Sequence, residues 1–214
     1  MSTPAVTIIV LAKAPVPGRV KTRLCPPCSY EDAAQLAAAA LGDTLDAVAH
    51  APAARRVLFL DGKRPPWVPT TFEVLAQRGG GLDERLAGAF ADIDGPAILV
   101  GMDTPQLTPQ LLSHAIDELL APAVDSVIGH AQDGGWWTLG LRRSDPQAFL
   151  GVPMSLPTTG ASQVERLDSL GLRVATLPSL IDVDDFPSAA AVAAGAPRTR
   201  FARAFDRLAI SVTG

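Results

Sequence analysis

A short basic segment, residues 13–23, carries the residue types that bind phosphate. It reads Lys-Ala-Pro-Val-Pro-Gly-Arg-Val-Lys-Thr-Arg, with four cations and no acid, in a chain whose formal net charge is −4. Prolines stiffen such a loop, and glycine lets backbone N–H groups approach a ligand. Cations around exposed amides can hold a polyphosphate. A solvated surface loop is the alternative interpretation. The candidates for binding such a polyphosphate are Lys13, Pro15, Gly18, Arg19, Lys21 and Arg23.

Acidic residues in two segments of the chain could hold a divalent metal. Asp103 follows the apolar run 97–101, and an acid at the tip of a buried strand near a basic loop indicates Mg²⁺. This ion takes one or two carboxylates together with substrate phosphates. Asp182 and Asp184 would share a face if their segment is extended, and either could complete the site. A turn-forming aspartate in the first case, and acids at a helix N-terminus in the second, are the alternatives.

The glycine run 79–81 lies between two arginines and could bring bare backbone close to a base or a phosphate. Gly80 and Arg85 are therefore further candidates for the nucleotide site. A flexible connector explains the same residues equally well.

A second glycine segment could contact the other substrate. Asp133, Gly134 and Gly135 could place a carboxylate and open backbone against it, although a hairpin turn accounts for the same residues. Trp136 and Trp137 must face opposite sides of their strand. One is expected in the core, and the other could line a pocket.

Familiar catalytic motifs are missing from the sequence. The run from Gly18 to Thr22 lacks the upstream glycine and the spacing of a Walker A motif, and no G-x-G-x-x-G occurs. None of the three histidines lies in H-E-x-x-H, and there is no G-x-S-x-G. Cys25-Pro-Pro-Cys28 could support thiol redox chemistry, but it does not directly follow a strand as such dithiols usually do.

Alternating strand and helix patterns would position these residues. Helices on both faces of a mostly parallel sheet follow from that alternation, and ligands of such sheets bind beyond the carboxyl ends of the strands. We see no internal repeat or boundary, so residues 1–214 are expected to form a single domain. Strands are expected at 6–12, 56–60, 72–77, 97–101, 126–130, 136–141 and 173–177. Helices are expected at 31–51, 82–93, from 109 to 120, and at 161–170, 187–194 and 199–208.

Composition excludes several classes of protein. Hydrophobic residues make up 48% and charged residues 19% of the 214 residues, which is typical of a globular chain. The acidic balance, with a pI of about 5.3, speaks against a nucleic-acid partner. No apolar run approaches the roughly 20 residues of a membrane span. Two cysteines suit a reducing compartment, so we expect a cytoplasmic protein. The sequence does not determine the oligomeric state.

Four segments, in order along the chain, resemble one bacterial glycosyltransferase-A-like family. They are residues 12–24, 101–107, 133–141 and 177–184. That family is known as radical-SAM/selenodomain-associated transferases, with molybdenum-cofactor guanylyltransferase and 2-phospholactate guanylyltransferase as distant kin. The resemblance implies the nucleotide-diphospho-sugar transferase fold, an α/β three-layer αβα architecture. It also implies that the first loop holds nucleotide phosphates and that Asp103 holds Mg²⁺.

The same resemblance indicates an acceptor site. Met154-Ser155-Leu156 stands where the family usually has Trp-Ser-Thr, and the segment from Asp133 to Leu141 resembles the family's Asp-Gly-Gly-aromatic-aromatic segment. The residues expected to bind the acceptor are Asp133, Gly134, Gly135, Trp136 and Ser155.

The leading hypothesis is metal-dependent nucleotidyl transfer from an NTP to a small anionic acceptor, with release of pyrophosphate. Mg²⁺ (or Mn²⁺), Lys21, Arg19 and Asp103 would supply the catalytic charge, and no covalent nucleophile is needed. The close alternative is glycosyl transfer from a nucleotide-sugar, which usually uses Asp-x-Asp where this chain has Asp103-Thr-Pro. A non-catalytic nucleotide sensor is the third interpretation.

Overall fold

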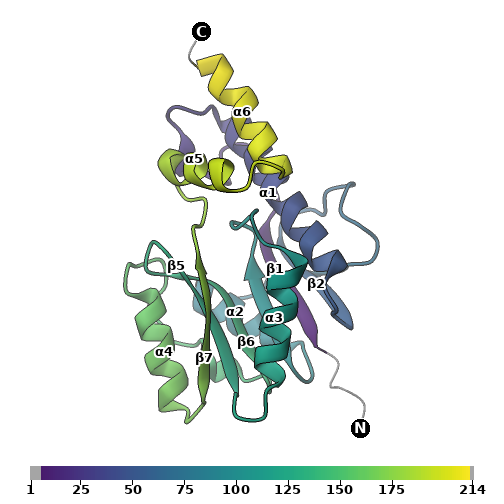
Figure 1. The fold of residues 1–214 in the computed structure, drawn as a ribbon, viewed down its shortest axis with the longest axis vertical. Helices are drawn as coiled ribbons and strands as arrows, with labels where there is room; N and C mark the ends of the chain where they lie inside the picture. Colours follow the sequence, from purple (N-terminus) through teal and green to yellow (C-terminus); the bar gives the residue numbers. More distant parts are fainter. Residues whose placement is uncertain (1–5, 213–214) are drawn as a thin grey trace.

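The computed structural model of the protein describes residues 6–212. Seven strands form one twisted sheet in the order β3-β2-β1-β4-β6-β5-β7 (Figure 1). All neighbouring strands pair in parallel except β6, which is antiparallel to β4 and β5. The strands are β1 (Thr7–Lys13), β2 (Arg55–Asp61), β3 (Glu73–Ala76), β4 (Ala97–Gly101), β5 (Ser126–Ala131), β6 (Trp136–Leu141) and β7 (Val174–Leu180). The prediction of a mostly parallel α/β sheet is confirmed.

Several helices begin at residues whose side chains cap them. Ser29 and Asp32 form a capping box at the start of α1, and the Thr108 hydroxyl accepts from the Leu111 N–H at the start of α3. The helices are α1 (Tyr30–His50), α2 (Leu82–Ala91), α3 (Pro109–Leu120), α4 (Thr159–Ser169), α5 (Phe186–Gly195) and α6 (Arg200–Val212), with short 3-10 turns η1 (Thr22–Leu24) and η2 (Pro146–Ala148).

Alternate residues of the central strands face opposite layers of helices. Ile8 and Val10 of β1 belong to a cluster with apolar residues of α1 and α3. Ile9, between them, belongs to a second cluster that includes residues of α2 and α4. The sheet is therefore covered on both faces, which is why its strands read as continuous apolar runs.

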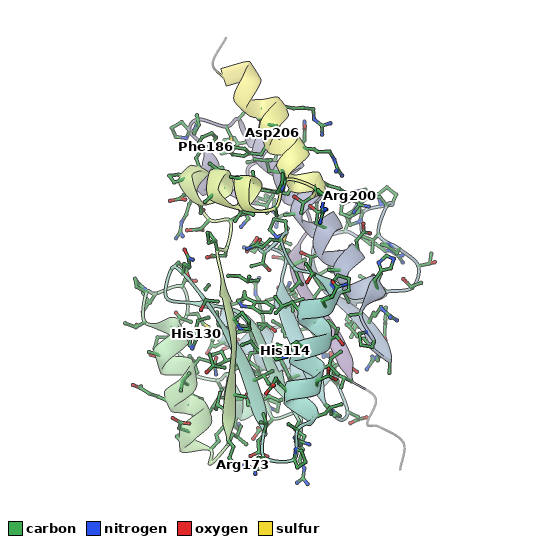
Figure 2. All side chains as sticks on the ribbon, in the orientation of Figure 1. His114, His130, Arg173, Phe186, Arg200 and Asp206 are labelled. Carbon is green, nitrogen blue, oxygen red and sulfur yellow. The ribbon has the colours of Figure 1, made fainter. Side chains whose placement is uncertain are left out.

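A third apolar cluster lies beside the sheet. Figure 1 shows α5 and α6 stacked on one end of α1, and Figure 2 labels Phe186 and Arg200 in this layer. Phe201 is fully buried there, and Leu24 of η1 joins the same cluster. The C-terminal helices thus anchor the far end of the basic segment.

Element boundaries differ from the sequence expectation by a few residues. β7 continues to Leu180 instead of ending at 177, and α4 begins at Thr159 instead of 161. Within the described residues, no helix is long and apolar enough to cross a membrane.

Candidate active site

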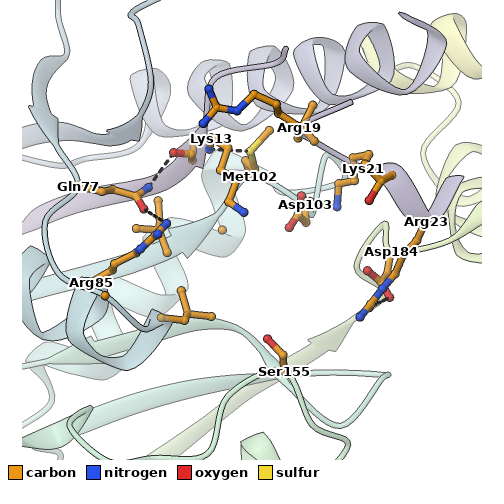
Figure 3. A pocket seen from close by; sticks show the side chains of 17 residues that line it. Lys13, Arg19, Lys21, Arg23, Gln77, Arg85, Met102, Asp103, Ser155 and Asp184 are labelled. Atoms are coloured by element: carbon orange, nitrogen blue, oxygen red, sulfur yellow. Dashed lines mark hydrogen bonds and ion pairs between the residues drawn. The ribbon is translucent and has the colours of Figure 1, made fainter. Parts of the chain in front are cut away.

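A cavity of about 530 Å³ opens at the carboxyl edge of the sheet, where β1 and β4 end. Figure 3 shows its labelled residues converging from the basic segment, the tip of β4, the start of α2 and the segments around residues 155 and 184. The parallel strands bring these distant segments to one edge, as the strand pattern predicts. Predicted site residues on its wall are Lys13, Arg19, Lys21, Arg23, Gly80, Arg85, Asp103, Ser155 and Asp184.

Lys21 is the most buried cation of this wall. Its side chain is 9% exposed, and Nζ lies 2.5 Å from Asp103 Oδ1. Nζ also donates to the Val183 carbonyl oxygen. The Val183 N–H in turn donates to the Asp103 carbonyl oxygen at 2.8 Å. These bonds join the basic segment, the β4 tip and the strand-to-helix segment after β7.

A second ion pair lies at the rim of the cavity. Arg23 Nη1 lies 2.7 Å from Asp184 Oδ2, and both side chains are exposed. The hydrogen bond to Asp184 raises the pKa of Arg23 above its usual value. Both carboxylates of the cavity wall, Asp103 and Asp184, therefore face a cation of the basic segment.

Asp182 has a different environment from its neighbours. It is not part of the cavity wall, and burial, followed by the negative charge of Asp133, raises its pKa above the ordinary range. Asp185 caps α5 by accepting from the Ser188 N–H, as the helix N-terminus interpretation of these acids expects. In residues 6–212, no three His, Cys, Asp or Glu side chains gather into a metal-binding cluster. Asp103, Asp182 and Asp184 thus do not form a preassembled three-carboxylate site.

The opposite wall contains Gln77, a residue that the sequence interpretation missed. Its Nε2 donates to the carbonyl oxygens of Ala12 at 2.8 Å and Phe59 at 2.9 Å. Arg85 Nη1 approaches Asp61 Oδ2 at 3.3 Å and Gln77 Oε1 at 3.5 Å. The side chain of Gln77 is therefore fixed across two strand ends. The sequence could have indicated Gln77, because it stands at the end of the expected strand 72–77, where ligands of such sheets bind.

Several predicted residues lie off this cavity. Pro15 and Gly18 belong to the basic segment without forming its wall. Asp133, Gly134, Gly135 and Trp136 are also absent from the wall.

The glycine segment 133–135 forms the hairpin turn between β5 and β6. Asp133 Oδ1 accepts from the Gly135 N–H at 2.8 Å, and the Gly134 carbonyl accepts from the Gly160 N–H at 2.8 Å. An added Cβ at Gly134 would lie 1.9 Å from the Pro157 carbonyl oxygen. The hairpin-turn interpretation accounts for these glycines, because the turn packs against the start of α4 and leaves no room for a side chain.

The two tryptophans of β6 differ in burial, as their alternation along the strand predicts. Trp137 is buried, and its indole N–H donates to the Pro178 carbonyl at 3.0 Å. Trp136 is half-buried and packs against the α2/α4 side of the sheet.

This combination of fold and cavity defines a class of protein. A mostly parallel sheet between helices, with a basic first loop and a strand-tip aspartate at its carboxyl edge, is the architecture of the nucleotide-diphospho-sugar transferases. Within that class, the chain belongs to the family DUF2064, described as an uncharacterized protein conserved in bacteria, whose model matches residues 37–156. No curated protein matches the sequence.

Solved structures support the same class. A protein from Desulfovibrio desulfuricans G20, assigned as a nucleotide-diphospho-sugar transferase, is 25% identical with a TM-score of 0.86, over 97% of this chain and 96% of that chain. A CMP:2-keto-3-deoxy-manno-octonic acid synthetase complexed with CTP is 13% identical, with a TM-score of 0.56 over 88% and 96%. A mannosyltransferase from Pyrobaculum calidifontis, in complex with GDP-Man and Mn²⁺, is 14% identical, with a TM-score of 0.56 over 96% and 65%. At their low identity, the last two show the fold alone.

Proposed function

We propose that the protein transfers a nucleotidyl group from an NTP to a small anionic acceptor and releases pyrophosphate. The observation that carries this proposal is the convergence of Lys13, Arg19, Lys21 and Arg23 with Asp103 on one cavity at the carboxyl edge of the sheet. Structural relatives that are transferases, and one synthetase complexed with CTP, support a nucleotide-using transferase. Four cations exceed the charge of a diphosphate and suit a triphosphate.

Charge stabilisation and positioning would do the chemical work. Lys13 and Arg19 would bind the outer phosphates, and Lys21 would place its ammonium at the phosphate beside Asp103. The acceptor oxygen would form a bond to the α-phosphorus while the bond from that phosphorus to the bridging oxygen breaks, and pyrophosphate leaves with the bond's electron pair. Fixed cations that meet the charge developing in this step are the usual source of rate enhancement at such sites. Ser155, on the opposite wall, would contact the acceptor.

The residues present fit a divalent metal that is shared with the nucleotide. Asp103 keeps its side chain 44% exposed at the strand tip, and Asp184 lies on the same cavity wall. One or two carboxylates with phosphate oxygens are what Mg²⁺ requires, and Mn²⁺ accepts similar ligands. When bound, the metal would supply Lewis-acid stabilisation of the phosphate charge. Asp182 would bind the metal only after a local rearrangement, because it lies outside the wall of the first cavity.

Glycosyl transfer from a nucleotide-sugar is the second candidate. The structural likeness to a mannosyltransferase in complex with GDP-Man favours it. The strand tip reads Asp103-Thr-Pro, without the second acid of an Asp-x-Asp motif, which favours the nucleotidyl reaction instead.

Thermal unfolding with Mg²⁺ or Mn²⁺, against a panel of NTPs and nucleotide-sugars, tests this choice. A ligand at about 100 times its Kd adds about 2.7 kcal/mol to stability, which raises the Tm of a chain of this length by about 5–10 °C. We expect an NTP to produce the shift, and Asp103→Asn to reduce it. A nucleotide-sugar that shifts the Tm while every NTP fails would replace the proposed reaction with glycosyl transfer. Binding without turnover in any acceptor mixture would favour a sensor.

A further inference from the structure

A second cavity, of about 490 Å³, lies between the basic segment and the end of β2. Lys13 and Arg19 line both cavities, so these two side chains form the partition between them. Lys63 and Asp61, at the end of β2 and just after it, complete the charged part of the second wall. The proposed function uses only the first cavity and leaves this one unassigned.

Backbone contacts join the two segments that line the second cavity. The Ala14 N–H donates to the Asp61 carbonyl at 2.8 Å, and this bond ties the segment after β1 to the end of β2. Gly62 has φ +114°, and a Cβ added there would lie 2.7 Å from Ala14 Cβ. The Val16 N–H donates to the Ala14 carbonyl at 2.8 Å and tightens the turn. These contacts fix the two segments that line the cavity relative to each other.

The charge of this cavity is unbalanced. In the described part of the chain, the side chains of Lys13, Arg19 and Lys63 form no ion pair and no hydrogen bond. The one carboxylate of the wall, Asp61, already faces Arg85 at 3.3 Å. Three cations converge here without a counter-ion of their own, and this arrangement attracts an anion.

The two cavities differ in how their cations are compensated. In the first, Lys21 and Arg23 face Asp103 and Asp184, so an anion there meets two carboxylates unless a metal covers them. In the second, no unpaired carboxylate is part of the described wall. An anion that carries no metal should therefore prefer the second cavity.

We propose that the second cavity is a metal-independent subsite for a phosphate-bearing anion, and that its ligand is the pyrophosphate leaving the first cavity. The identity of this ligand rests on the proposed function, whereas the anion site itself does not. Lys13 and Arg19 can contact phosphate from either side of the partition. Pyrophosphate can thus pass from the reaction cavity to Lys63 without losing its cationic partners.

Calorimetric titration with inorganic pyrophosphate, in chelator and at low salt, tests the subsite. Lys63→Gln removes a cation that lines only the second cavity, and Lys21→Gln removes one that lines only the first. Arg198→Gln is the control, because Arg198 is exposed, lines neither cavity, and has a side chain with no partner among residues 6–212. Losing one charge-assisted hydrogen bond should weaken binding about tenfold in Lys63→Gln. Lys21→Gln should weaken binding less than Lys63→Gln does, and Arg198→Gln should stay within about twofold of the wild type.

Two further titrations distinguish the phosphate compounds that could occupy the second cavity. Orthophosphate and a non-hydrolysable NTP are titrated under the same conditions, and we expect pyrophosphate to bind more tightly than either. Tightest binding of orthophosphate would make the ligand a free phosphate, and tightest binding of the NTP would make the subsite part of the donor site. Both results overturn the assignment to pyrophosphate.

Other results separate this inference from the proposed function. The inference falls if the wild type does not bind pyrophosphate, or if Lys21→Gln rather than Lys63→Gln weakens it. If binding depends on Lys63 while no NTP gives a Tm shift or turnover, the proposed reaction fails and the anion site stands. If NTP turnover is found while Lys63→Gln binds pyrophosphate like the wild type, the reaction stands and the subsite fails.

Discussion

Lys21 and Ser155 share an unusual backbone conformation and a location. They are the non-glycine residues with positive φ in the described chain, at 52° and 60°, and both line the first cavity. Such conformations cost on the order of 1–3 kcal/mol and persist where the surroundings enforce them. At Lys21, the enforcing contacts are those to Asp103 and Val183. Strain at two facing walls of one cavity fits a site that is built for a ligand.

Replacing Lys21 should separate stability from activity. We expect Lys21→Met to lower kcat/KM on the order of 10²-fold, because a cation that meets the transferred phosphate is lost. It should also lower the Tm, because Asp103 loses its partner. The double variant Lys21→Met/Asp103→Asn should recover the Tm and leave activity low. Steady-state kinetics and thermal unfolding check both effects, with Arg198→Met as the control; unchanged turnover in Lys21→Met would remove its role.

At the scale of elements, the β5–β6 hairpin and the start of α4 pack backbone against backbone. Gly134, at φ +91°, would place a Cβ 1.9 Å from the Pro157 carbonyl oxygen. Gly95, at φ +81°, has nothing within 4 Å of the same added atom. At both positions a side chain is strained by the positive φ, and only at Gly134 does it also clash with a neighbouring atom.

Gly134→Ala should therefore destabilise the protein much more than Gly95→Ala. The shared positive φ costs about 1 kcal/mol at each position, and overpacking at Gly134 should add about 1–3 kcal/mol. Urea unfolding of both variants measures the difference. Equal losses would mean that the hairpin does not sit on α4 as described.

A salt bridge joins the beginnings of β5 and β7. Arg173 Nε and Nη2 bond the Asp125 carboxylate at 2.7 and 3.0 Å, and these bonds lower the pKa of Asp125 to about 2 from 3.8. A carboxyl whose pKa is lowered by folding stabilises the protein above its unfolded pKa, and this contribution disappears as the pH falls through the folded pKa. The wild-type Tm should fall more steeply between pH 4 and pH 2 than that of Asp125→Asn. If the Tm of the wild type and of Asp125→Asn fell equally across that pH range, the Asp125–Arg173 ion pair would not contribute to stability.

Local signals explain why most elements were predictable. Thr108-Pro109 marks the start of α3, and the continuous apolar runs mark the buried strands. Because parallel strands end at one edge, the basic segment and Asp103 could also be placed together in advance. The antiparallel pairing of β6 follows from the glycine turn at 133–135.

The remaining parts of the site depend on long-range contacts. Lys21 bonds Val183 across 162 positions, and no local pattern specifies that partner. Gln77 is fixed by carbonyl groups of two other strands, which a single segment cannot reveal. Asp184 lies on the cavity wall and the half-buried Asp182 does not, whereas the sequence leaves the two equivalent.

For the whole molecule, the question is whether the C-terminal helices form one cooperative unit with the sheet. The Asp43 carboxylate of α1 accepts from the N–H groups of Arg200 at 2.9 Å and Phe201 at 2.8 Å, which secures the start of α6. Leu24 and Cys28, which follow the basic segment, pack in the same cluster as Phe201. Through this cluster, the helices support the loop that lines both cavities, and we propose that residues 1–214 form a single domain.

Phe201→Ala and Phe149→Ala test that proposal as a matched pair. Both rings are fully buried, the first in the cluster of α5 and α6, the second against α2 beneath the sheet. Each truncation should cost about 3–5 kcal/mol and lower the Tm by about 10 °C. In a single domain, both variants unfold in one transition, because a loss of stability in either cluster lowers the stability of the whole domain. Far-UV circular dichroism follows all helices, and tryptophan fluorescence follows the sheet through the buried Trp137. The two signals should coincide in both variants; if Phe201→Ala loses helix signal well before the fluorescence changes, α5 and α6 form a separate unit.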